Sequence, residues 1–157
     1  MSGKYKILMV CLGNICRSPV AEGILRHLAT EKELEIEVDS AGTSGYHRGE
    51  APDIRTQKNA KKNGVDLSML RSRQFTPEDF DNFNCIYVMD QFNYRDVVLL
   101  AKNDEQKKKV KLLLNEVFPN ENKSVPDPYY GGEKEFEEVF QLVKKACEKI
   151  IEHNAVK

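Results

Sequence analysis

The sequence lacks an apolar stretch long enough to cross a membrane and an excess of charge of either sign. No run of about 18 apolar residues occurs in its 157 residues, and the apolar stretch in MSGKYKILMVCLG is too short for a secretory signal. Its 24 basic and 25 acidic residues balance, which predicts no broad basic face for nucleic acid. Lysines 107–109 are interpreted as solvated surface. We therefore expect a cytoplasmic protein that binds neither membranes nor nucleic acid.

Cysteines are also few, at four in the chain. A chain of this size with 40% hydrophobic residues can bury a core without disulfides, so we expect reduced thiols and a single domain over residues 1–157. Cys85 lies in the apolar segment NCIYVMD, and Cys147 lies on the apolar side of the last helical pattern. Both are predicted to be small core residues.

Short apolar runs alternate with helical patterns along the chain. KILMV, from Lys6 to Val10, is typical of a strand buried on both faces. Further strands are predicted at 35–42, 85–90 and 110–114. The pattern at 110–114 also fits a helix. The helical patterns occur at 18–33, 53–64, 76–83, 91–102 and 134–153.

Local signals mark the ends of these predicted helices. Ser18 is expected to cap the first helix with Pro19 in its first turn, and Thr76 to cap the third. Gly64 is expected to end the second helix in the left-handed conformation. The alternation predicts a three-layer α/β fold, in which a four-stranded parallel sheet is flanked by helices. Ligands bind beyond the carboxyl ends of such strands, so the loop after the first strand is the first candidate for a ligand site.

That loop, in VCLGNICRSP, separates Cys11 from Arg17 by five residues. A loop of this length that opens a helix can direct its N–H groups to one point, where the helix dipole adds positive potential. Arg17 can hold two oxygens of one anion, and the same field favours the thiolate of Cys11. Gly13 and Asn14 tolerate a positive φ, and Ser18 can donate to the sulfur.

A simple strand-to-helix turn would explain Ser18 and Pro19 but not the spacing of Cys11 and Arg17. A metal site is disfavoured, because Cys11 and Cys16 have the wrong spacing for a zinc knuckle and no further cluster completes four ligands. The loop is therefore interpreted as a phosphate-binding loop that carries a cysteine nucleophile.

The loop resembles the signature of the low-molecular-weight protein tyrosine phosphatases, which is cysteine, five residues, arginine and serine near the N-terminus. The resemblance continues in the same order with DSAGTSGY, YVMD and DPYYGG, and several ordered matches are more specific than one. It implies hydrolysis of phosphotyrosine in proteins or peptides and of small aryl phosphates. It also implies that phosphate-like anions occupy the loop and that no cofactor or metal is needed.

The resemblance assigns roles to matching positions. Cys11 would form a cysteinyl-phosphate, Arg17 would clamp the phosphoryl oxygens, and Asp127 would protonate the departing phenolate and later activate water. Cys16 would guard Cys11 by forming a reversible disulfide on oxidation. The implied substrate-binding residues are Leu12, Gly13, Asn14, Ile15, Cys16, Ser18, Tyr46, Tyr129 and Tyr130.

A supporting set is also implied. Asn14 and Ser40 would hydrogen-bond to each other and hold the loop, and Asp90 would orient Arg17. The family often has a histidine in this network where the present sequence has Leu70. His27 and His47 are interpreted as surface residues rather than replacements for it.

Two other functions are consistent with part of this pattern. An arsenate reductase of the same fold would use a similar loop but would need further mobile cysteines, which Cys85 and Cys147 supply poorly. A non-catalytic phosphotyrosine-binding module would need neither a nucleophile nor an acid. A monomer or a weak homodimer is expected, and the latter could bury exposed tyrosines.

Overall fold

The centre of the structure is a parallel β-sheet. The computed structural model describes residues 4–155, in which four strands have the spatial order β2-β1-β3-β4. All neighbouring pairs are parallel, as predicted. The strands are β1 (Tyr5–Cys11), β2 (Ile36–Gly42), β3 (Cys85–Val88) and β4 (Val110–Leu112). The fourth strand is shorter than predicted, because the chain turns after Leu112 into a 3₁₀ helix, η1 (Leu113–Glu116).

Strand β1 is buried on both faces. Ile7 and Met9 belong to one core cluster, while Leu8 and Val10 belong to another on the opposite face, and all four side chains are 0% exposed. Successive side chains of a strand point to opposite faces. The continuous apolar run therefore reflects a central strand covered by helices on both sides.

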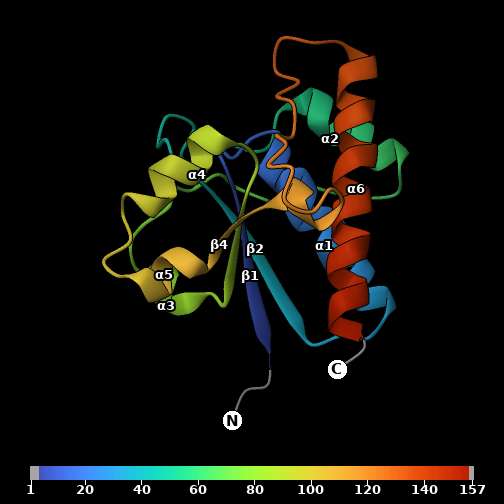
Figure 1. Ribbon diagram of the computed structural model, residues 1–157. Coiled ribbons are helices and arrows are strands. Elements are labelled where there is room, and N and C mark those ends of the chain that lie inside the picture. Colours follow the sequence, from blue (N-terminus) through green and yellow to red (C-terminus); the bar gives the residue numbers. More distant parts are fainter. Residues whose placement is uncertain (1–3, 156–157) are drawn as a thin grey trace.

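Helices cover the two faces of the sheet unequally (Figure 1). The longest, α6, lies beside α1 on the face where α2 is also found, and the opposite face carries three shorter helices. The first group is α1 (Arg17–Glu31), α2 (Ile54–Lys62) and α6 (Glu133–Ala155). The second group is α3 (Asp79–Asn82), α4 (Gln91–Val98) and α5 (Asp104–Lys108).

Two predicted helix starts were wrong. Helix α1 begins at Arg17, directly from the loop, and its N-cap Cys16 makes no side-chain capping bond. Ser18 therefore lies inside the helix, and its hydroxyl is directed to a partner in the loop rather than to the helix end. Helix α3 begins at Asp79 rather than after Thr76, because the chain first makes a tight turn in which the amides of Asp79 and Phe80 donate to the carbonyls of Thr76 and Pro77 at 2.9 and 3.1 Å.

Other local expectations had mixed outcomes. Cys85 and Cys147 are core residues as predicted, at 2% and 0% exposed. Gly64 follows α2 with φ of 88°, which confirms the predicted helix stop. Helix α5 was not predicted, and Asn103 caps it by accepting from the amide of residue 106 at 2.8 Å. Lys109 is not a purely solvated lysine, because it donates to two backbone carbonyls at the end of α3.

The chain topology places a crevice at the carboxyl end of β1. From β1 the chain passes to β2 on one side and then crosses to β3 on the other. Ligands of open α/β sheets bind where the strand order reverses in this way. No helix within residues 4–155 combines the length and apolarity needed to span a membrane.

The packing of β3 predicts the effect of a core substitution. Ile86 is 0% exposed between β1 and β4, whereas Leu99 is 75% exposed after α4. We expect Ile86→Ala to lower the free energy of unfolding by about 2–5 kcal/mol, because it leaves a cavity. Leu99→Ala should change it by no more than about 0.5 kcal/mol. Urea denaturation of both variants would measure this, and similar losses would contradict the assigned packing.

Candidate active site

The loop between β1 and α1 turns its carbonyl groups outward. Its carbonyls accept hydrogen bonds from neighbouring segments. The carbonyls of Cys11, Leu12 and Ile15 accept from the amides of Thr43, Ser44 and Asp53, respectively, at 2.9 Å each. The Gly13 carbonyl accepts from the Ser72 hydroxyl at 3.2 Å. In a trans peptide the next N–H points the opposite way, so the amides of residues 12, 13, 14 and 16 face the other side of the loop. One of these, the Asn14 N–H, donates to Cys11 Sγ at 3.3 Å. The loop thus gathers N–H donors on the side of the sulfur.

Asn14 holds this loop through both ends of its amide. Its φ of 58° is in the left-handed region, which Asn tolerates better than most residues. Nδ2 donates to Ser18 Oγ at 2.8 Å and to Ser40 Oγ at 2.9 Å, and Oδ1 accepts from the Arg73 amide at 3.0 Å. The Asn14–Ser40 bond that the resemblance implied is therefore present. Ser18 Oγ in turn lies 3.0 Å from Cys11 Sγ.

The network ends on Glu22, which the sequence analysis missed. Glu22 is 4% exposed and its Oε1 accepts from Ser40 Oγ at 2.6 Å. Arg26 pairs with the same carboxylate and also donates to the carbonyl of Val38. Leu70, where a supporting histidine was considered, instead packs against the core. No signal in the sequence of the first helix distinguished Glu22 from its other charged residues.

Arg17 is fixed by two acceptors from distant segments. The residue is 4% exposed, and its Nη1 donates to Asp90 Oδ2 and to the Val125 carbonyl, each at 2.9 Å. Asp90 also caps α4, because its Oδ1 accepts from the Asn93 amide at 2.7 Å. The other terminal nitrogen, Nη2, lies 3.8 Å from Asp127 Oδ2. Arg17 is therefore held at one edge and directed to Asp127 at the other.

These groups border one cavity of about 330 Å³. Most of the candidate residues line it, namely Cys11, Leu12, Gly13, Ile15, Cys16, Arg17, Tyr46, Asp127, Tyr129 and Tyr130. Asn14, Ser18, Ser40 and Asp90 are not part of the lining, and they support the loop and Arg17 instead. Tyr46 and Tyr130 are 87% and 97% exposed, so they stand at the rim.

His47 also lines the cavity, which corrects its interpretation as a surface residue. A Cβ atom on Gly13 would lie 3.1 Å from His47 Cδ2, so the glycine permits this close packing. His47 Nδ1 is 3.0 Å from Glu50 Oε1, and its ring meets Tyr46 edge-on with centroids 5.4 Å apart. His27 is at the surface as predicted, about half exposed and paired with Glu31.

Burial holds three thiols, those of Cys16, Cys85 and Cys147, in the neutral form. Burial raises the pKa of Cys16 to about 12, and the nearby carboxylates of Asp53 and Asp127 act in the same direction. Burial also raises the pKa of Cys85 and of Cys147. The part of the chain from 4 to 155 contains no group of three or more His, Cys, Asp or Glu side chains placed to hold a metal ion.

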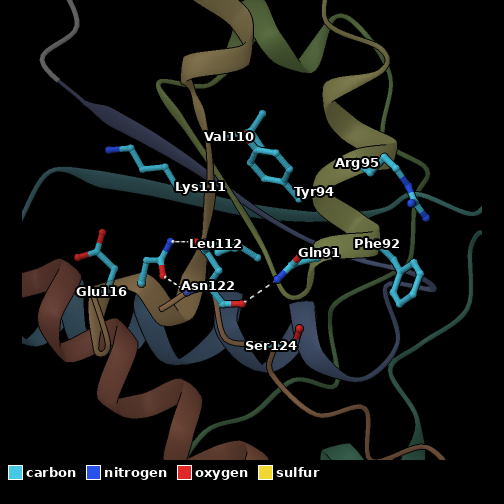
Figure 2. A pocket seen from close by; sticks show the side chains of 11 residues that line it. Gln91, Phe92, Tyr94, Arg95, Val110, Lys111, Leu112, Glu116, Asn122 and Ser124 are labelled. Atoms are coloured by element: carbon cyan, nitrogen blue, oxygen red, sulfur yellow. Dashed lines mark hydrogen bonds between the residues drawn. The ribbon is translucent and has the colours of Figure 1, made fainter. Parts of the chain in front are cut away.

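A second, larger cavity of about 900 Å³ lies along β4 and α4 (Figure 2). Gln91 Nε2 donates across it to the Asn122 carbonyl at 3.1 Å, with Tyr94 and Arg95 on α4. Its lining has neither a cysteine nor an aspartate, and it includes Ser124, next to the Val125 that holds Arg17. Cys11, Arg17 and Asp127 occur together only in the smaller cavity among those described.

Comparison with known proteins agrees with this geometry. The sequence model of one family, described as low molecular weight phosphotyrosine protein phosphatase, matches residues 6–157. The chain belongs to this family. The phosphatase is 43% identical over 150 residues to the human low molecular weight phosphotyrosine protein phosphatase, with 93% of each chain covered.

Solved structures agree in fold with the phosphatase. YfkJ from Bacillus subtilis superimposes with a TM-score of 0.88 at 40% identity, covering 97% of this chain and 95% of the other. Wzb from Vibrio vulnificus, solved with benzylphosphonate, gives a TM-score of 0.85 at 29% identity, covering 95% and 98%. The protein is therefore a protein tyrosine phosphatase, a hydrolase with the expected three-layer α/β fold.

The thiol environments predict selective alkylation. At pH 7, iodoacetamide should modify Cys11 alone, because Cys11 borders the cavity and its sulfur accepts a hydrogen bond from the Asn14 amide. Cys16 borders the same cavity, but its raised pKa of about 12 keeps it protonated until strongly alkaline pH. Peptide mass spectrometry would locate the adducts, with Cys11→Ser as the control. Equal labelling of Cys16 at pH 7 would contradict this assignment.

Proposed function

We propose that this phosphatase cleaves phosphotyrosine in two displacements at phosphorus. The Cys11 thiolate attacks the phosphorus, the P–O bond to tyrosine breaks, and the phenolate leaves with the proton of Asp127. A water molecule then gives its proton to Asp127 and attacks the cysteinyl-phosphate. The S–P bond breaks, which returns the thiolate and releases inorganic phosphate.

The observation that carries this proposal is the meeting of Cys11, Arg17 and Asp127 in one cavity. Arg17 and the inward-facing amides supply the positive charge that offsets the phosphoryl oxygens during transfer. Ser18 Oγ, 3.0 Å from Sγ, stabilises the thiolate when it leaves in the second step. The side chain of Asp127 is 48% exposed, so it has access to water for that step.

The rim of the cavity supports an aromatic substrate. Tyr129 and Tyr130 meet edge-on with ring centroids 5.0 Å apart, and Tyr46 stands near His47. Leu12 adds an apolar side chain that is 52% exposed. Such walls can pack against a phenyl ring carrying the phosphate. We therefore propose phosphotyrosine proteins or peptides and small aryl phosphates as substrates, in line with the benzylphosphonate bound by the Vibrio vulnificus relative.

The two competing functions have less support. An arsenate reductase needs mobile cysteines to relay a disulfide, but Cys85 lies in β3 and Cys147 in α6, both buried in the core. A binding module would not require Asp127 beside Arg17. Arsenate-dependent oxidation of thioredoxin by this protein would overturn our proposal.

The proposed chemistry predicts the behaviour of two variants. Cys11→Ser should abolish hydrolysis of p-nitrophenyl phosphate and phosphotyrosine, because it removes the nucleophile. Asp127→Asn should lose on the order of 10²–10⁴ in kcat/KM with phosphotyrosine, whose leaving group needs a proton, and much less with p-nitrophenyl phosphate.

Initial rates with both substrates would test this, with EDTA in place of any added metal. Equal losses of Asp127→Asn on the two substrates would exclude the general-acid role.

We also propose that Cys16 protects the nucleophile. Peroxide would oxidise Cys11 to the sulfenic acid, and the Cys16 sulfur would then attack the Cys11 sulfur. The S–O bond would break, the departing hydroxide would leave as water with the proton of the Cys16 thiol, and a Cys11–Cys16 disulfide would form. Both cysteines are free in the structure and border the same cavity. Oxidation also removes the negative charge of Cys11, one of the groups that raise the pKa of Cys16.

This proposal predicts the recovery of activity after oxidation. Wild-type enzyme treated with hydrogen peroxide should regain most of its activity with dithiothreitol, because the disulfide blocks further oxidation of Cys11. Cys16→Ser should regain less as exposure lengthens, because Cys11 advances to sulfinic acid. Activity assays with mass spectrometry of the Cys11 peptide would follow both. Full recovery of Cys16→Ser would refute the protective role.

A further inference from the structure

Arg55, on the first turn of α2, lies between two aromatic rings beside the cavity. Its Cζ is 5.4 Å from the ring centroid of Tyr129 and 4.9 Å from that of Phe136. Both distances are within the range of a cation–π contact. No sequence pattern singles out Arg55, because neither aromatic partner is near it in the chain.

Asp53 holds the Arg55 guanidinium in this position. Arg55 Nε donates to Asp53 Oδ1 at 3.0 Å and Nη2 to Oδ2 at 2.8 Å, a two-bond contact that fixes the guanidinium plane. The Asp53 amide donates to the Ile15 carbonyl of the phosphate loop at 2.9 Å. Phe136 also packs against Ile15 and Cys16. Arg55 is therefore tied to the loop by a hydrogen-bonded path and by the ring of Phe136.

On its other side, Arg55 contacts the segment that carries the acid. The Tyr129 amide donates to Asp127 Oδ1 at 3.1 Å, so the residue under the guanidinium also holds the carboxylate. Within residues 4–155, the hydrogen bonds of the 126–131 segment are local, as in the bond from the Gly131 amide to the Pro128 carbonyl. Asp127 is 3.8 Å from Arg17 Nη2, too far for a hydrogen bond. The contact between Arg55 and Tyr129 thus joins the 126–131 segment to helix α2.

We propose that Arg55 is a positioning residue, which places Asp127 over the phosphate loop through Tyr129. The path runs from Ile15 through Asp53, Arg55 and Tyr129 to Asp127. Arg55 does not line the cavity that contains Cys11, so it acts on the acid through Tyr129. This inference rests on the proposed function of Asp127 as the general acid.

The test compares leaving groups. For Arg55→Gln, kcat/KM should fall about fivefold more with phenyl phosphate than with p-nitrophenyl phosphate, the effect of losing one exposed cation–π contact. The reason is that kcat/KM covers the steps through departure of the leaving group, and phenolate depends more on the acid. Tyr129→Leu is a second variant for the case that Arg55→Gln folds poorly. It removes the aromatic ring and should show the same larger loss of kcat/KM with phenyl phosphate.

Three controls separate positioning from general structural damage. Arg95→Gln removes an arginine with a similar contact, since its Cζ lies 5.3 Å from the ring centroid of Phe92 in the larger cavity. This variant should leave the ratio of kcat/KM between the two substrates unchanged. Inhibition by inorganic phosphate should change less than about twofold in Arg55→Gln, since the phosphate loop is intact. When Asp127→Asn is already present, adding Arg55→Gln should no longer change the ratio.

Each result distinguishes this inference from the function on which it rests. Suppose that Asp127→Asn loses more kcat/KM with phenyl phosphate than with p-nitrophenyl phosphate, but Arg55→Gln and Tyr129→Leu lose equally with both. The positioning role is then wrong, and the general-acid role of Asp127 stands. A several-fold weaker phosphate inhibition in Arg55→Gln would also overturn it, because Arg55 would then act on the loop. If Asp127→Asn loses kcat/KM equally with the two substrates, the general-acid proposal fails, and the positioning role fails with it.

Discussion

The proposed chemistry depends on keeping negative charge stable at the end of a buried strand. Cys11 ends β1 and is 3% exposed, and burying a charge is costly unless nearby groups compensate for it. The loop meets this need by pointing its carbonyls outward to neighbouring segments, which turns its amides inward. The positive φ of Asn14 and the position of Ser18 inside α1 follow from the same need, since both bring donors to the sulfur.

Arg17 connects the loop around Cys11 to the rest of the fold. It leaves the loop at the start of α1 and is bonded to Asp90, at the end of β3, and to Val125, close to the acid-bearing segment. Anchoring an arginine at one edge leaves its other edge to bind an anion with little loss of conformational freedom. The same bonds bring the segment before Asp127 to the loop, although the two are more than 100 positions apart in the sequence.

The loop around Cys11 and the proposed acid Asp127 differ in how many hydrogen bonds to distant segments hold them. The loop is surrounded by backbone and side-chain hydrogen bonds that reach the buried Glu22, whereas Asp127 is half exposed on a segment with local bonds. The Arg55 contact with Tyr129 compensates for this difference in our proposal. An exposed segment that carries the proposed acid beside a fixed loop suits an enzyme that must admit a phosphotyrosine side chain attached to a larger partner.

The parallel α/β fold and the residues of the loop from Cys11 to Arg17 are set by short stretches of the chain. Alternating apolar runs and the Cys11–Arg17 spacing are encoded by residues close together in the chain, so local rules could predict them. The predicted approach of Ser18 to the sulfur is present, but only the packed structure places Glu22 at the end of the network and His47 against Gly13. The physical reason is that these contacts join distant segments, whose meeting depends on how the whole sheet and its helices pack.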